Sequence, residues 1–303
     1  MSNLLNHLRI ALVGFLMGCA DVVPGVSGGT IAFICGIYER LLNGIKSFDI
    51  TSLKLVLKGD LKGVRARIPF PFFIALGIGL LTAIATLAKV LEHLMTHHPA
   101  QLWSFFFGLV LGSILLLGKK TWSWKPVDWV VFLGFAGGTF ILVGLQSLQT
   151  PEGLPFVFIA GAIAICAMIL PGISGSYLLV IMGKYATIIE AVNDRNLVTL
   201  GVFCAGIATG ILSFVRVVSW LLSHHRHVTL IALTGVMAGA LRTLWPWKET
   251  LTTRINSSGE AVPLTQANIM PGAESNFLVA IALAVVGGVA VLLIERLAKA
   301  EEA

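Results

Sequence analysis

Long apolar runs separated by short polar stretches follow one another along the whole chain of 303 residues. A transmembrane helix needs about 20 consecutive, mainly apolar residues. Runs of this kind predict membrane spans at about 71–95, 101–118, 127–147, 199–222, 228–246 and 276–297. The pattern therefore predicts an all-α polytopic membrane protein, in which most of the surface faces lipid.

Two further apolar regions, 5–46 and 154–192, are each interrupted by a P-G-x-S-G motif. Proline ends a helix because it lacks an amide donor, and glycine allows the backbone to turn at positive φ. Irregular backbone at membrane depth persists only where protein or water satisfies its polar groups. We therefore expect each region to form a re-entrant helical hairpin, with its motif at a tip inside the bilayer.

The two motifs belong to a repeat that covers most of the chain. Residues 24–38 align without a gap with residues 171–185, at a constant offset of 147. In the next block Lys89 aligns with Arg216 at an offset of 127, because only the first half carries the basic linker 46–69. Such self-similarity is typical of transporters built from internal repeats. We predict two repeats, 1–147 and 148–303, each with one hairpin followed by three spans.

The number of crossings and the loop charges predict the orientation. Three crossings per half would give the halves opposite orientations, so the repeat is expected to be inverted. Lysine and arginine gather in 46–69, in 119–125 and at Arg226 and Arg296, whereas 148–153 has neither. Cytoplasmic loops carry this excess, so both termini are expected to be cytoplasmic. Two full spans in place of each hairpin would leave every loop on the same side, and the sequence leaves that alternative open.

Composition excludes a soluble protein. The chain is 56% hydrophobic and 12% charged, whereas about a quarter of the residues in a soluble domain are charged. The net charge of +6 is explained by the cytoplasmic loops and does not indicate a nucleic-acid partner. Membrane lipids are expected partners, and the oligomeric state, a homodimer included, is left open.

The hairpin tips are the predicted binding site. After each Pro-Gly break a new helix begins, and its free N–H groups and neighbouring hydroxyls are suited to an anion. Cations inside apolar spans are functional candidates as well, because burying one costs about 2.5–3.5 kcal/mol on insertion scales. A simple kink capped by serine, and a cation whose long side chain reaches the headgroups, are the structural alternatives. The predicted phosphate-binding residues are Ser27, Gly28, Gly29, Thr30, Ser174, Gly175, Ser176, Tyr177, Arg216 and Lys89.

Acidic residues near the first motif have no counterparts in the second repeat. Asp21 aligns with Met168, and we expect this carboxylate to couple transport to an ion or a proton. Glu39 and Arg40 close the first hairpin and are candidates for gating or for anchoring it at the interface. The histidine clusters at 93–98 and 224–227 would lie on opposite sides of the membrane, so we expect no metal site and no cofactor.

Both motifs resemble those of the bacterial polyprenyl-phosphate transporter family. The matching segments are M-G-C-A-D-V-V-P-G-V-S-G-G-T with G-I-Y-E-R, and L-P-G-I-S-G-S-Y. The resemblance implies a flippase of the cytoplasmic membrane that returns undecaprenyl phosphate, a lipid carrier of cell-wall precursors, from the outer to the inner leaflet. The family's motif residues correspond to Asp21, Pro24, Ser27, Gly28, Gly29, Thr30, Glu39, Arg40, Pro171, Ser174, Gly175, Ser176 and Tyr177.

Two other functions fit parts of the pattern. A membrane polyprenyl-diphosphate phosphatase would share re-entrant repeats, but it is expected to need an arginine directly after the motif serine and paired glutamates. Gly28 and Gly175 stand after the serines here, and no span contains E-x-x-x-E. A small-anion or solute transporter could use the same helix ends. The sequence therefore favours a transporter over an enzyme.

Overall fold

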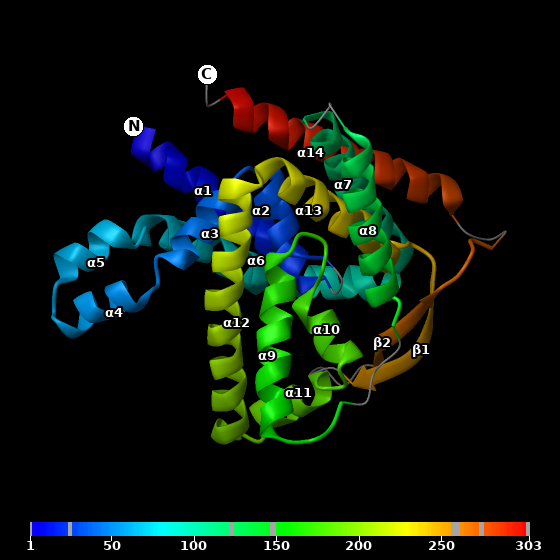
Figure 1. The fold of residues 1–303 in the computed structure, drawn as a ribbon. Helices are drawn as coiled ribbons and strands as arrows, with labels where there is room; N and C mark the ends of the chain where they lie inside the picture. Colours follow the sequence, from blue (N-terminus) through cyan, green and yellow to red (C-terminus); the bar gives the residue numbers. More distant parts are fainter. Residues whose placement is uncertain are drawn as a thin grey trace.

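The computed structural model describes residues 2–23, 26–120, 124–145, 150–255, 261–272 and 276–300. Helices account for most of them, and Figure 1 shows how they are arranged. The first half contains α1 (Ser2–Val22), α2 (Gly28–Ile34), α3 (Tyr38–Lys46), α4 (Ile50–Leu57), α5 (Leu61–Arg67), α6 (Phe70–His97), α7 (Pro99–Lys120) and α8 (Pro126–Leu142). The second contains α9 (Leu154–Ile169), α10 (Gly175–Ile181), α11 (Tyr185–Asn193), α12 (Leu197–His224), α13 (Arg226–Ala240), the 3-10 helix η1 (Leu241–Leu244), β1 (Lys248–Ile255), β2 (Ala261–Asn268) and α14 (Phe277–Ala300).

Helices long and apolar enough to cross a membrane make up the body of the molecule. Among the described residues six meet this condition: α1, α6, α7, α12, α14, and α13 together with η1. The chain is therefore a helical, multi-pass membrane protein. The expected span 127–147 is shorter than predicted, because α8 ends at Leu142 and the chain turns at Val143 and Gly144. The expected spans 228–246 and 276–297 correspond to α13 with η1 and to α14.

Four pairs of helices pack with their backbones in close contact. Along α1 and α6, Gly14 faces Leu76 and Gly18 faces Leu80, so residue numbers rise together and the two helices run parallel. A Cβ atom on Gly79 of α6 would lie 1.8 Å from the carbonyl oxygen of Ala11. Small residues allow this approach between membrane helices. The other parallel pairs are α9 with α12 (Gly206 facing Phe158, Gly210 facing Ala162), α7 with α14 (Gly108 facing Ala284, Gly112 facing Gly288) and α8 with α13 (Gly235 facing Phe132, Gly239 facing Ala136).

These pairs connect the two halves of the sequence. The pairs α1–α6 and α9–α12 each form within one half, whereas α7–α14 and α8–α13 each combine one helix from either half. Both termini lie at one end of the molecule, and α11 and the β1–β2 hairpin lie toward the opposite end (Figure 1). The main hydrophobic core contains side chains from both halves, including Val23, Phe72, Val215 and Met237.

The second arm of each expected hairpin consists of two short helices. Residues 27–46 form α2 and α3, and residues 174–192 form α10 and α11. Gly36 and Gly183 separate the two helices at φ of 73° and 66°, a left-handed conformation that favours glycine. Helices α10 and α11 meet at a bend of 107°.

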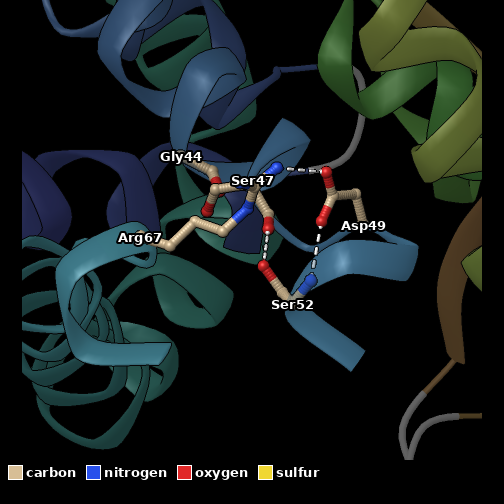
Figure 2. Close-up of polar contacts among 5 residues, drawn as sticks. All are labelled: Gly44, Ser47, Asp49, Ser52 and Arg67. Carbon is tan, nitrogen blue, oxygen red and sulfur yellow. Dashed lines mark hydrogen bonds and ion pairs between the residues drawn. The ribbon is translucent and has the colours of Figure 1, made fainter. Parts of the chain in front are cut away.

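The basic linker 46–69 contains two short helices held by a polar network (Figure 2). Asp49 caps α4 by accepting a hydrogen bond from the Ser52 amide at 2.8 Å, and its other oxygen lies 2.5 Å from the Arg67 guanidinium. These contacts lower the pKa of the Asp49 carboxyl, the Ser52 amide contributing most. The Ser52 hydroxyl donates to the Ser47 carbonyl and the Ser47 hydroxyl to that of Gly44, each at 2.6 Å. The network holds α4 and α5 against the end of α3.

Candidate functional site

The two P-G-x-S-G motifs meet in the interior of the molecule. The hydroxyl of Ser27 donates a hydrogen bond to the carbonyl of Met168 at 3.1 Å. In the opposite direction, the amide of Gly172 donates to the hydroxyl of Thr30 at 2.8 Å. Both hydroxyl-bearing residues are almost fully buried, with exposed fractions of 2% and 0%. These two hydrogen bonds join the start of α2 to the break between α9 and α10.

The first motif satisfies its own helix end. Ser27 is the N-cap of α2, and its hydroxyl accepts the Gly29 amide at 3.1 Å. The Asp21 carboxylate, at the end of α1, accepts the Gly28 amide at 2.6 Å. A Cβ atom on Gly28 would lie 2.6 Å from that carboxylate, so only glycine permits the contact. The N–H groups that we expected to be free for an anion are thus bound to Asp21 and Ser27.

The second motif leaves its helix end without a side-chain cap. Gly172 turns the chain at φ 98°, and no side chain caps α10. The Ser174 hydroxyl lies 2.9 Å from the hydroxyl of Ser176, and either can be the donor. Position 168, which aligns with Asp21, holds a methionine, and this explains the difference between the two helix starts.

A small pocket of about 120 Å³ lies between the motifs. It combines one carboxylate with three hydroxyls, and no cationic side chain is among its lining residues. Hydroxyls can donate to phosphate oxygens, whereas a carboxylate can only accept unless it is protonated. The lining residues are Asp21, Val26, Ser27, Met168, Ser174, Gly175 and Ser176.

Six of the ten predicted phosphate-binding residues are not among the residues that line this pocket. The Tyr177 hydroxyl donates to the carbonyl of Val143 at 2.6 Å, at the end of α8. The Arg216 guanidinium donates to the carbonyl of Leu212, one turn earlier on its own helix. Lys89 is exposed on α6, beyond Leu87, where the apolar part of that helix ends. Gly28, Gly29 and Thr30 are the first residues of α2, directly after Ser27, and all three are buried.

Glu39 and Arg40 also lie away from the pocket. Glu39 forms an exposed ion pair of 2.8 Å with Arg226, at the start of α13. The Arg40 guanidinium lies over the ring of Phe72, 4.6 Å from its centroid. Both contacts attach α3 to neighbouring helices.

Sequence reasoning missed Arg242, which lies in a second and larger cavity of about 360 Å³. Its position in η1 corresponds to Leu115 in the first half, so the repeat gave no signal. The available signal was a single arginine beside Trp245 and Trp247 at the end of an apolar span. The cavity is lined by Phe107, Phe140, Ala238, Leu241, Arg242, Trp245 and Asn268.

Comparison with known proteins assigns a family. The model of the undecaprenyl phosphate translocase-like family matches residues 17–262, which include both motifs. The chain belongs to this family. The chain is 48% identical over 269 residues to a polyprenyl-phosphate transporter of Vibrio cholerae, which covers 88% of this chain and 87% of that protein. It is 31% identical over 259 residues to a polyprenyl-phosphate transporter of Staphylococcus aureus, covering 78% of this chain and 85% of that protein. No solved structure matches the chain.

Proposed function

We propose that this protein transports polyprenyl phosphate, specifically undecaprenyl phosphate, from the outer to the inner leaflet of the bacterial cytoplasmic membrane. The observation that carries the proposal is the pocket formed jointly by the two repeated motifs, inside a chain of this family. Its three hydroxyls suit a phosphate head, while the prenyl tail would stay in the lipid outside the helices. The names of both relatives support the same substrate class.

The proposed architecture is a pair of inverted repeats, each with a re-entrant hairpin. Equivalent helices support it, since α1–α6 and α9–α12 pair in the same way and α7–α14 and α8–α13 exchange partners between the halves. His98 and His225, the C-cap residues of the equivalent 28-residue helices α6 and α12, have nearly the same backbone angles. With the basic linker on the cytoplasmic side, both termini are cytoplasmic as well.

Asp21 gives the proposed cycle a coupling group. A phosphate entering the pocket would meet a carboxylate within the same small space, and two anions there repel each other unless one carries a proton. Proton uptake together with the substrate removes this repulsion. It also frees the Gly28 amide to donate to the phosphate instead of to Asp21.

Arg216 and Lys89 are kept as candidate phosphate contacts at other stages of alternating access. Arg216 lies within the span formed by α12, and its guanidinium donates to a carbonyl of that same helix in this conformation. Glu39 and Arg40 are proposed to set the position of the first hairpin, since they attach α3 to α13 and α6.

The test is binding to purified protein of undecaprenyl phosphate, undecaprenol and inorganic phosphate. The double variant Ser27→Ala, Ser174→Ala should bind the lipid phosphate at least about a hundred times more weakly, because two hydrogen bonds to a charged group are lost and each contributes about 1.5–3 kcal/mol. The control Ser104→Ala, Ser113→Ala removes two buried hydroxyls that only bond their own helices, and it should bind as the wild type does.

Other outcomes favour other functions. Equal binding of inorganic phosphate would indicate a small-anion transporter. Release of phosphate from an added diphosphate lipid would indicate a phosphatase. Unchanged binding by the double serine variant would remove the motif pocket from the proposed site.

A further inference from the structure

The larger cavity differs in chemistry from the motif pocket. Most of its lining is apolar or aromatic, and helices of both halves contribute: α7 with Phe107, α8 with Phe140, and the end of α13. Arg242 and Asn268 supply the polar groups. A cavity with a long apolar wall and one cation matches an amphiphile with an anionic head.

Arg242 is held so that its charge stays available. One guanidinium nitrogen donates to the carbonyl of Phe140 at 3.0 Å, and the group lies over the Phe140 ring, 4.5 Å from its centroid. The Asn268 amide fixes the Arg242 backbone through a 2.7 Å hydrogen bond to its carbonyl. Among the described residues no carboxylate pairs with this arginine. A guanidinium has five N–H donors in a planar fork, so several remain for phosphate oxygens.

Lys248 is the other basic side chain near Arg242, but only Arg242 carries a permanent positive charge. Lys248 lies over the Trp103 ring, 3.4 Å from its centroid, and its ammonium donates to the Thr243 carbonyl. Burial lowers the pKa of Lys248 to about 7, so this side chain is partly neutral at physiological pH. Arginine remains charged throughout.

The Arg242 cavity lies next to the motif pocket, and the turn at Val143 and Gly144, after α8, connects the two. A Cβ atom on Gly144 would collide with the Arg242 guanidinium, and the preceding residue, Val143, accepts the Tyr177 hydroxyl. Tyr177 in turn follows Ser176, which lines the motif pocket. On the other side, Gly172 of the second motif packs against Met237, next to Ala238 of the Arg242 cavity.

The position along the membrane normal also fits. The β1–β2 hairpin, which follows η1, lies toward the end opposite the termini (Figure 1). Trp245 lines the cavity and makes an edge-to-face contact with Trp247, and tryptophan gathers at the level of the headgroups. With cytoplasmic termini, the Arg242 cavity faces the outer leaflet.

We propose that the Arg242 cavity is a docking site for the phosphomonoester head of the transported lipid on the outer side, before it enters the motif pocket. This inference rests on the proposed function. The head would bind the free edge of the guanidinium, and the first prenyl units would lie against Phe107, Phe140 and Leu241. Tyr177 would separate the docked head from the motif pocket.

The test is transport by protein in liposomes at varied undecaprenyl phosphate concentration in the donor leaflet. Arg242→Gln should raise the concentration for half-maximal transport about tenfold or more, since it loses a charged hydrogen bond, with the maximal rate little changed. Arg242→Lys keeps the charge without the fork, and it should give a smaller increase. If the Arg242→Gln protein does not insert into the membrane, the Arg242→Lys variant is used for the same measurement. The control Arg65→Gln removes another exposed arginine, on α5, and should leave both parameters unchanged.

Competing lipids identify the ligand. Phosphatidylglycerol, a phosphodiester, should compete weakly for the Arg242 cavity, and inorganic phosphate should not compete. Equal competition by phosphatidylglycerol would overturn the proposal by assigning the cavity to bulk phospholipid. Wild-type half-maximal concentration in Arg242→Gln would overturn it as well. A wild-type protein that neither binds nor moves the lipid would instead refute the proposed function.

Discussion

Asp21 occupies the position where an incoming anion would first meet the start of α2. Its carboxylate already accepts the Gly28 amide at 2.6 Å, in a pocket that otherwise offers hydroxyls. A phosphate can replace it only if the carboxylate gains a proton or moves away. We therefore propose that the charge of this residue connects binding of the lipid head to the proton supply.

We predict that Asp21→Asn makes transport insensitive to the proton gradient. The amide is isosteric and carries no charge, so it neither repels phosphate nor takes up a proton. The measurement is lipid movement in liposomes with and without an imposed pH difference. A gradient response equal to that of the wild type would show that another group carries the coupling.

At the residue scale, the sequence predicted the motif pocket better than the cations. Ser27, Ser174 and Ser176 lie together because a repeated motif fixes their place relative to a helix break. Arg216 is not directed to the pocket, and the sequence could not reveal this. Span 199–222 is apolar on all sides, so its pattern does not indicate which side of the helix faces the interior. The position that aligns with Arg242 in the first half holds a leucine, so comparison of the repeats does not single out this arginine.

At the element scale, helix packing depends on particular glycines. Gly79 touches the backbone of α1, whereas nothing lies within 4 Å of a Cβ atom on Gly77 of the same helix. The second half repeats the contrast on α12, where Gly206 faces the Phe158 carbonyl and a Cβ on Gly201 meets open space. These glycines provide matched variants within single helices.

We predict that Gly79→Ala destabilises the protein by about 1–3 kcal/mol, because the added methyl group would force α1 and α6 apart. Gly77→Ala should change stability by less than about 0.5 kcal/mol, as expected for a position without contacts. Thermal unfolding of the purified variants in one detergent gives the comparison. Equal losses for the two variants would contradict the close packing of α1 and α6.

The sequence predicted the long helices but not the short elements between them. Apolar runs of span length are strong signals, whereas the breaks at Gly36 and Gly183 depend on single residues with positive φ. The β1–β2 hairpin, whose first strand is rich in threonine, falls between the expected spans 228–246 and 276–297, where the apolar pattern predicts no element. Helices α4 and α5 were not predicted either, because the linker was interpreted from its basic charge alone.

At the scale of the whole molecule, neither half of the chain contains the partners of all its helices. Helix α7 packs against α14, and α8 packs against α13. Two of the four closely packed helix pairs therefore form only when both repeats are present. The apolar faces of α7 and α8 would otherwise meet lipid without the glycine contacts that fit them. Such an exchange makes the repeats interdependent.

We predict that the segments 1–147 and 148–303, expressed separately, are degraded or aggregate, and that co-expression restores a complex. The physical reason is that each segment alone leaves two of its helices without their parallel partners. Copurification of one tagged segment with the other, followed by binding of undecaprenyl phosphate, provides the measurement. A stable, monodisperse single segment would show that a repeat folds alone.

The two hydrogen bonds between the motifs, from Ser27 to Met168 and from Gly172 to Thr30, have a consequence for the timing of transport. Separating the motifs breaks both, and at roughly 1 kcal/mol each this slows the opening of an empty carrier roughly thirtyfold. A lipid head that recruits the Ser27 hydroxyl releases one of these bonds in advance. In the proposed cycle, binding of the lipid head would therefore favour opening of the protein, and an unloaded protein would rarely cycle and would dissipate little of any ion gradient.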